Sequence, residues 1–160
     1  MLMNKPELKY AILGHSIGYS LSPLIHNTAF RLKNINARYD IVDFPPENFI
    51  EQISQLKKAD YNGFNVTIPY KSRIMEYLDV IDPEAEFIGA VNTIHVNNGR
   101  WCGYNTDVAG FLSPLKTISK KLTTCVILGN GGAARAVLYG LSQDNTIKNI
   151  YFLVNTPSRQ

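Results

Sequence analysis

The sequence is poor in cysteine, in long apolar runs and in clustered basic residues. Its two cysteines, Cys102 and Cys125, have no metal-ligand spacing and cannot form a disulfide framework, and we expect Cys125 to be a core residue. No stretch of about 18 apolar residues is present, so no membrane span is expected. The N-terminus lacks a basic segment followed by an apolar one, the pattern of a secretory signal. We therefore expect a cytoplasmic protein that binds no metal.

Charge is also limited, because charged residues make up 18% of the chain and the net charge is +3. Tight basic pairs occur at Lys57-Lys58 and Lys120-Lys121, and such pairs are typical of solvated helix ends or linkers. Hydrophobic residues make up 45%, which is ordinary for a globular protein and argues against disorder. We expect a small molecule as the partner, and neither nucleic acid nor a membrane.

What the sequence does contain is an alternation of strand and helix patterns. The predicted strands span 8–13, 37–44, 63–68, 91–96, 100–103, 123–128 and 149–154. The predicted helices span 23–33, 47–57, 71–78, 106–115 and 136–141. Ser22 is the expected N-cap of the first helix, and Asn97-Asn98-Gly99 predicts a hairpin turn. This order indicates an α/β fold with mostly parallel sheets, in which the hairpin makes the first sheet mixed. The strands at 123–128 and 149–154 read as buried.

A glycine-rich turn connects the strand at 123–128 to the following helix. Gly129 permits the tight turn, Gly131 lets the backbone approach a diphosphate, and Ala134 keeps the helix close to the strand. The N–H groups at the helix start favour anions. The pattern predicts dinucleotide binding, with a plain structural turn as the alternative. The residues of the predicted site are Gly129, Asn130, Gly131, Gly132, Ala133, Ala134 and Arg135.

The end of the next strand bears on the choice of cofactor. An acidic residue there would accept a hydrogen bond from a ribose hydroxyl and favour NAD. Here the strand is followed by Asn155, Thr156 and Arg159, with no acid. Arg159 favours NADP, whose phosphate it can pair with, although a solvated surface arginine is the alternative.

Four short motifs place polar side chains at the ends of predicted elements. Ser20 and Ser22 can converge on a carboxylate at a helix start, although spacing alone favours helix capping by Ser22 and a local turn at Ser20. Thr67 and Lys71 follow a strand at the edge where α/β proteins bind ligands, yet a lone lysine is more often a surface residue. Two further polar residues, Asn92 and Asp107, adjoin buried-type segments, and Asp107 suits the first turn of a helix.

The order of these motifs is more specific than any one of them. Ser-x-Ser-Pro, Asn-Val-Thr-Ile-Pro-x-Lys, Ala-Val-Asn-Thr, Gly-Tyr-Asn-Thr-Asp and Gly-x-Gly-Gly-Ala together resemble the shikimate dehydrogenase family, from about Tyr10 to Asn155. The resemblance implies an oxidoreductase that reversibly reduces 3-dehydroshikimate to shikimate with NADPH, in the pathway to chorismate and the aromatic amino acids. It implies that Ser20 and Ser22 hold the substrate carboxylate. The implied ligands of the ring hydroxyls are Thr67, Lys71, Asn92 and Asp107, with Lys71 and Asp107 as the catalytic pair.

The sequence departs from the family pattern at several points. Ser16 and Tyr19 stand where the family often has proline and histidine, and Asn155-Thr156 lacks the arginine that commonly follows the asparagine. The alternatives are therefore a quinate/shikimate dehydrogenase that uses NAD, or a shikimate-binding or regulatory module without catalysis. A homodimer is a further expectation.

The resemblance divides the chain into a substrate-binding domain at 1–104, a connecting helix and linker at 105–120, and the first βαβ portion of a Rossmann-like domain at 121–160. A nucleotide-binding sheet normally needs two such halves. We therefore expect an incomplete second domain with uncovered apolar residues from Tyr151 to Val154, and little or no turnover by the chain alone.

Overall fold

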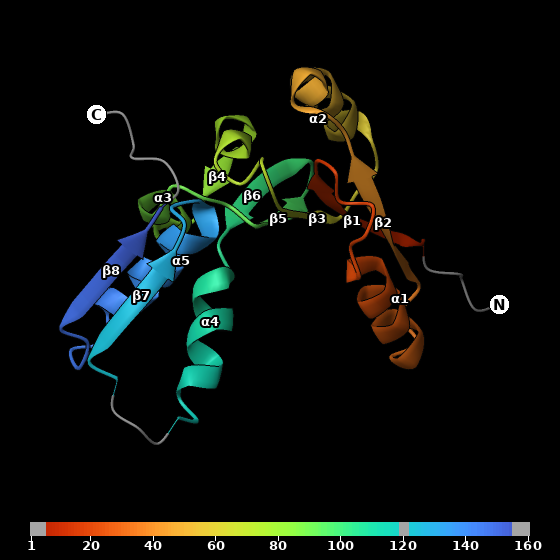
Figure 1. Cartoon of the computed structure of the whole chain (residues 1–160). Coiled ribbons are helices and arrows are strands. Elements are labelled where there is room, and N and C mark those ends of the chain that lie inside the picture. Colours follow the sequence, from red (N-terminus) through yellow and green to blue (C-terminus); the bar gives the residue numbers. More distant parts are fainter. Residues whose placement is uncertain (1–5, 119–121, 155–160) are drawn as a thin grey trace.

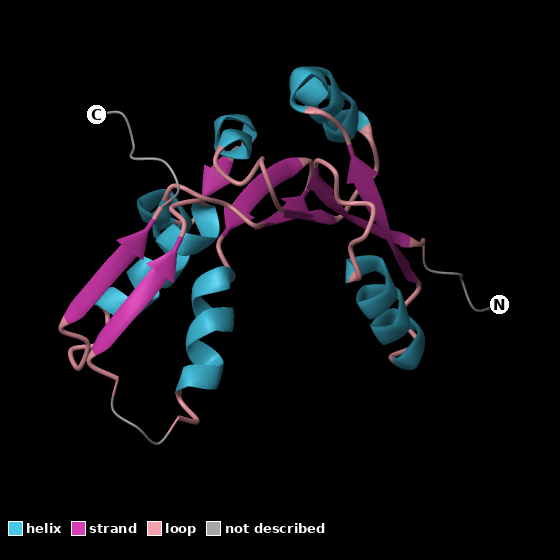
Figure 2. Cartoon of the chain, in the orientation of Figure 1, coloured by secondary structure: helices cyan, strands magenta, loops and turns pink. Residues whose placement is uncertain are grey.

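The structure, a computed structural model, describes residues 6–118 and 122–154. The strands are β1 (Leu8–Gly14), β2 (Ala37–Asp43), β3 (Gly63–Val66), β4 (Val80–Ile81), β5 (Thr93–Asn97), β6 (Arg100–Tyr104), β7 (Thr124–Leu128) and β8 (Asn149–Leu153). The helices are α1 (Ser22–Leu32), α2 (Phe49–Lys58), α3 (Pro83–Ile88), α4 (Asp107–Leu115) and α5 (Gly132–Ser142), with 3-10 turns η1 (Pro46–Asn48) and η2 (Arg73–Tyr77). Figures 1 and 2 show these elements.

The predicted α/β fold with a mixed first sheet is confirmed. A six-stranded sheet has the order β2-β1-β3-β5-β6-β4, and a separate two-stranded sheet pairs β7 with β8 in parallel. In the first sheet β1 runs parallel to both β2 and β3, whereas β3 and β5 are antiparallel. The predicted hairpin joins β5 to β6 through Asn98 and Gly99, whose φ angles of 51° and 77° match the two-residue turn that hairpins favour.

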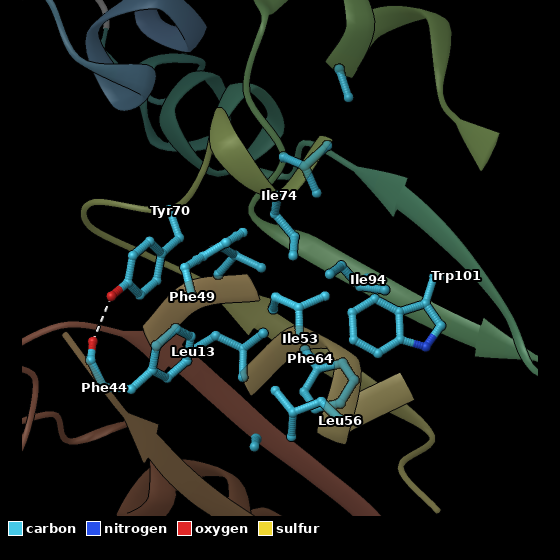
Figure 3. Packing of buried hydrophobic residues seen from close by; sticks show 14 residues of the cluster. Leu13, Phe44, Phe49, Ile53, Leu56, Phe64, Tyr70, Ile74, Ile94 and Trp101 are labelled. Atoms are coloured by element: carbon cyan, nitrogen blue, oxygen red, sulfur yellow. Dashed lines mark hydrogen bonds between the residues drawn. The ribbon is translucent and has the colours of Figure 1, made fainter. Parts of the chain in front are cut away.

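The core of the first sheet lies under α2. Strand β1 alternates, so that Ala11 and Leu13 face this core while Ile12 faces α1 on the opposite side, as the placement of the two helices in Figure 1 shows. Helix α2 contributes Phe49, whose ring packs near Tyr70 (Figure 3). The other buried members of this cluster are Phe44, Ile53, Leu56, Phe64, Val66, Ile74, Ala85, Val91, Ile94 and Trp101.

Several local predictions were wrong. Ser22 is the first residue of α1 rather than its cap, and its hydroxyl accepts a hydrogen bond from the hydroxyl of Ser20. Leu21 takes the cap position, and its apolar side chain makes no capping bond. The segment predicted as a helix at 71–78 is a turn followed by η2. Helix α3 and strand β4 were missed, although Asp82 caps α3 by accepting from Glu84 N at 3.0 Å.

The strands of the second sheet are more exposed to solvent than their apolar sequence predicts. Val126 is 57% exposed and Cys125 is only partly buried, so the prediction of a buried β7 with a core cysteine is wrong. A two-stranded sheet offers few neighbours, and α5 packs against one side of it. The uncovered apolar residues predicted at 151–154 are confirmed, since all four are exposed. Among the described residues, no helix is long and apolar enough to cross a membrane.

Candidate active site

The loop between β1 and α1 brings two serine hydroxyls together. Ser20 Oγ donates to Ser22 Oγ at 3.1 Å and accepts from the Ser22 N–H at 3.2 Å. The Ser20 N–H is held by the carbonyl of Ile17 at 2.9 Å. Both serines line a hollow of about 520 Å³ that Thr67 also lines. The arrangement presents paired hydroxyls at the start of α1, which suits a carboxylate.

Lys71 is held by its neighbours at a defined place beside the first sheet. The preceding residue, Tyr70, is buried, and its hydroxyl donates to the carbonyl of Phe44 at 2.5 Å (Figure 3). Burial raises the pKa of Tyr70, so the phenol stays protonated and keeps this bond. The Lys71 carbonyl accepts from Val91 N at 2.8 Å. These contacts fix the backbone from which the Lys71 side chain extends.

The ammonium of Lys71 forms an ion pair with Asp107 at the start of α4. Lys71 Nζ lies 2.5 Å from Asp107 Oδ2, and the two side chains are 16% and 28% exposed. The other carboxylate oxygen, Oδ1, accepts from Asn92 Nδ2 at 2.7 Å. Asp107 is therefore shared between a cation and an amide, which fixes the orientation of both. The lysine keeps donor capacity for a ligand, because an ammonium has three N–H groups.

A second layer of polar side chains supports this cluster. Asn92 Oδ1 accepts from Thr106 N at 2.9 Å, and Asn92 Nδ2 donates to Thr106 Oγ1 at 3.0 Å. Asn105, which is 8% exposed, accepts from Asp107 N at 2.9 Å and donates to the Ala90 carbonyl at 2.9 Å. These bonds connect the start of α4 to the segment before β5, so the acid is fixed relative to the lysine.

The glycine turn lies across a cleft from these groups. Gly129 has a φ of 93° and donates its N–H to Leu153 O at 2.8 Å, which continues the pairing of β7 with β8 as far as the start of the turn into α5. Gly131 precedes α5 without a side-chain cap, and a Cβ there would meet nothing within 4 Å. The space beside Gly131 and the unpaired N–H groups that begin a helix fit a dinucleotide diphosphate.

Two hollows meet at Thr67 and Ile68. One is the serine hollow, and the other is a cleft of about 470 Å³ lined by Lys71, Ser72 and the segment from Gly131 to Arg135. Because both share Thr67 and Ile68, the serine pair and the glycine turn flank the same strand end. The lysine lies on the side of the glycine turn.

Arg135 joins the two parts of the structure. Its Nη2 donates to Ser72 Oγ at 2.6 Å and to the carbonyl of Gly89 at 2.8 Å. The guanidinium group is thus hydrogen-bonded to the first part of the chain. Its predicted role in binding the cofactor stays a prediction. The remaining cofactor residues predicted at Asn155, Thr156 and Arg159 lie outside the described residues.

The structure brings together most of the predicted side chains. Lys71, Asn92 and Asp107 form one bonded cluster, and Thr67 connects its cleft to the serine pair. Of the predicted glycine-turn residues, 131–135 line the cleft, whereas Gly129 and Asn130 form the turn before it. Sequence reasoning missed Asn105, whose place beside Asp107 in the Asn-Thr-Asp motif was the available signal, and Ser72, for which there was none.

Comparison with known proteins identifies the family of this chain. Residues 12–94 match the family model described as the shikimate dehydrogenase substrate binding domain. The chain belongs to the shikimate dehydrogenase family. The NADP(+)-dependent shikimate dehydrogenase of Dictyoglomus thermophilum is 43% identical over 159 residues, which are 98% of this chain and 58% of that protein. The corresponding enzyme of Nitrosopumilus maritimus is 46% identical over 84% of this chain and 50% of its own length.

Solved structures of shikimate dehydrogenases have the same fold. The enzyme from Peptoclostridium difficile gives a TM-score of 0.87 at 36% identity, covering 95% of this chain and 58% of that one. The Thermus thermophilus enzyme in complex with NADP(H) and shikimate gives 0.84 at 36% identity, over 95% of this chain and 57% of its own. The chain thus spans a little over half the length of these family members.

Among the described residues, no group of His, Cys, Asp and Glu is arranged to hold a metal ion.

Proposed function

We propose that the chain carries the substrate site and part of the cofactor site of an NADP-dependent shikimate dehydrogenase, which reversibly reduces 3-dehydroshikimate to shikimate. The observation that carries this proposal is the bonded cluster of Lys71, Asp107 and Asn92, whose lysine lines the same cleft as the glycine turn, next to the hollow of the serine pair. We further propose 1–104 as the substrate-binding domain, 105–120 as the connection and 121–160 as the first portion of the nucleotide-binding domain.

The serine pair and the polar cluster divide the binding of shikimate between them. The hydroxyls of Ser20 and Ser22 hold the carboxylate at the start of α1. Thr67, Asn92 and the Lys71–Asp107 pair hold the ring hydroxyls. Because the groups at either end bind chemically different parts of the substrate, the ring is oriented with its reacting carbon toward the lysine.

Catalysis depends on a charged donor at the reacting oxygen. NADPH supplies the hydride to the ketone carbon when it is bound. Lys71 gives a proton to the ketone oxygen, and its charge stabilises the negative charge that develops there. Asp107 holds the ammonium in position through the 2.5 Å contact and accepts from a substrate hydroxyl.

The cofactor diphosphate is assigned to the start of α5. Gly131, Gly132, Ala133 and Ala134 line the cleft there, and the backbone N–H groups of this first turn are the donors. The proposed preference for NADP over NAD rests on two relatives named for NADP(+). Asn155, Thr156 and Arg159 are the side chains proposed beside the ribose phosphate. A cytoplasmic location and a homodimer are further expectations.

Ligand binding and hydride transfer test this proposal directly. Calorimetry on the chain should give binding of shikimate and of NADP⁺, each with one site. On the chain alone, oxidation of NADPH on addition of 3-dehydroshikimate should be slow or absent, because only part of the cofactor site is present. A longer protein that contains these residues should oxidise NADPH, and NADH more slowly. Binding of shikimate without any hydride transfer by that longer protein would favour the alternative of a binding module. Absence of binding by shikimate would overturn the assignment of the substrate site.

A further inference from the structure

The loop that carries the serine pair is held by a carboxylate from a neighbouring strand. Asp43 ends β2 and lies opposite Gly14, the last residue of β1. Its Oδ1 accepts from the N–H of Ser16 at 2.8 Å, and its Oδ2 accepts from the N–H of Ile17 at 2.7 Å. Both oxygens of one carboxylate are therefore used to bind consecutive backbone N–H groups. Hydrogen bonds to a charged acceptor are stronger than those between neutral groups.

The conformation of Ser16 explains why the loop needs such a partner. Its φ is 56°, in the left-handed region that residues with a Cβ rarely adopt. Proline could not take this place, because it has neither an N–H to donate nor access to a positive φ. Ser16 and Asp43 thus form an arrangement that proline would not permit.

A continuous series of bonds runs from Asp43 to the serine pair. Ile17, which is bound by the carboxylate, is 3% exposed and packs with Ile12 and Tyr39. Its carbonyl accepts from the N–H of Ser20 at 2.9 Å. The loop is also tied by His15, whose N–H donates to Ile68 O at 3.0 Å. Release of Asp43 would free Ser16 and Ile17 and so would loosen the residue that orients Ser20.

We propose that Asp43 is a positioning residue for substrate binding: it holds the loop at 15–20 in the shape that directs both serine hydroxyls toward the substrate carboxylate. The inference rests on the proposed function, because it takes the ligand of the serines to be a carboxylate. Asp43 itself does not touch the substrate in this account. Its loss should therefore weaken recognition of the carboxylate and leave the chemistry at Lys71 intact.

The test compares shikimate with its uncharged methyl ester in calorimetric titrations of the chain. Asp43→Ala should lower the affinity for shikimate by about tenfold or more, because a tenfold change corresponds to the loss of one charge-assisted hydrogen bond. The affinity for the ester should fall by about twofold or less. Asp43→Asn keeps one acceptor oxygen and should fall between Asp43→Ala and the wild type. Ser20→Ala combined with Ser22→Ala gives the size of the effect when the hydroxyls themselves are removed.

Asp40→Asn is the matched control, because this carboxylate lies on the same strand but pairs with Arg38 at 3.5 Å and has no contact with the loop. It should bind both ligands as the wild type does. Shikimate affinity of Asp43→Ala within about twofold of the wild type, or an equal loss for acid and ester, would overturn the proposal.

An amide NMR measurement separates failure of this proposal from failure of the proposed function. In Asp43→Ala the N–H signals of Ser16 and Ile17 should move from their wild-type positions, and the N–H of Ser20 should exchange faster than in the wild type. If the wild type bound no shikimate, the proposed function would fail, and the proposed role in shikimate binding would fail with it. These signals would then still decide whether Asp43 shapes the loop. Unchanged exchange at Ser20 would show that it does not.

Discussion

The two sheets of this chain differ in what they bury and in what they offer a ligand. The first sheet covers itself with α2, so that Phe49 and Ile53 are 0% and 1% exposed. The second sheet leaves Phe152 and Leu153 at 42% and 62% exposed. The α2 side of the first sheet is therefore well packed within the described residues, whereas the apolar surface of the second sheet is largely exposed.

The chemistry divides along the same line. The first part presents side chains to the cleft, among them the lysine and aspartate that form the ion pair. The second part presents mainly backbone at the glycine turn, where the absence of side chains makes the space. Removal of a side chain should therefore impair binding in the first part, and addition of a side chain should impair binding in the second.

The largest difference should appear in amide hydrogen exchange. Central strands β1 and β3 should exchange about 10³-fold more slowly than β8, because exchange from a packed core requires unfolding while an uncovered edge opens locally. Mass-spectrometric exchange on the chain measures both regions in one sample. Equal protection of β1 and β8 would mean that the second sheet is as stable as the first and would remove the contrast.

Deletion of one side chain in the first part should abolish the chemistry. Measured in a longer protein that contains these residues, Lys71→Ala should slow single-turnover hydride transfer by about 10²–10⁴-fold, because it removes the proposed proton donor. Shikimate affinity should stay within about tenfold, which is the cost of one hydrogen bond to a charged group. Lys57→Ala, on α2, is the control and should react at the wild-type rate. A normal rate in Lys71→Ala would exclude the lysine as the donor.

Addition of a side chain in the second part should have an effect confined to the cofactor. Gly131→Val should bind NADP⁺ about tenfold or more weakly, because its side chain would occupy the space into which the diphosphate fits. Shikimate affinity should be unchanged. Gly110→Val makes the same change at an exposed position of α4 where there is also open space, and it should bind both ligands normally. Unaltered NADP⁺ affinity in Gly131→Val would place the diphosphate elsewhere.

A local effect on stability should come from weakening the junction between the two parts. Arg135→Ala removes the bonds to Ser72 and to the Gly89 carbonyl, and it should lower the free energy of unfolding of α5 by about 1.5 kcal/mol. Exchange at the amides of α5 reports this value locally. Arg31→Ala, at the exposed end of α1, should leave α5 unchanged. If α5 were as protected in Arg135→Ala as in the wild type, the arginine would contribute nothing to the junction.

Local patterns in the sequence predicted much of this architecture. The hairpin at Asn98-Gly99 and the turn at Gly129 followed from residues that permit positive φ, a property readable without any contact. The missed helix α3 was readable in the same way, because Asp82-Pro83 is a cap followed by a proline at the first position. Burial of β7 was predicted wrongly. An apolar sequence indicates that a strand would be stabilised by burial, but it does not show whether other strands or helices cover the strand.

Long-range partners were beyond the reach of sequence patterns. The ion pair of Lys71 and Asp107 entered only through the family resemblance, since spacing alone favoured a surface lysine. The partner of Arg135 lies 63 residues away, and Asp43 bonds across 27 residues to the loop. The spacing of polar residues along the sequence does not predict these partners. Each pair forms only because the fold brings distant segments of the chain together.

One contact across the cleft also bears on how such a sequence can diverge. A Cβ on Gly132 would lie 3.1 Å from the Cβ of Ala90 and 3.4 Å from that of Lys71. The first separation is tighter than ordinary packing, so an alanine at 132 would require its neighbours to move. Gly132, the first residue of α5, and Ala90, which belongs to the first part of the chain, are therefore not independent sites for mutation. A side chain gained at position 132 would need a compensating change at a position 42 residues earlier in the sequence.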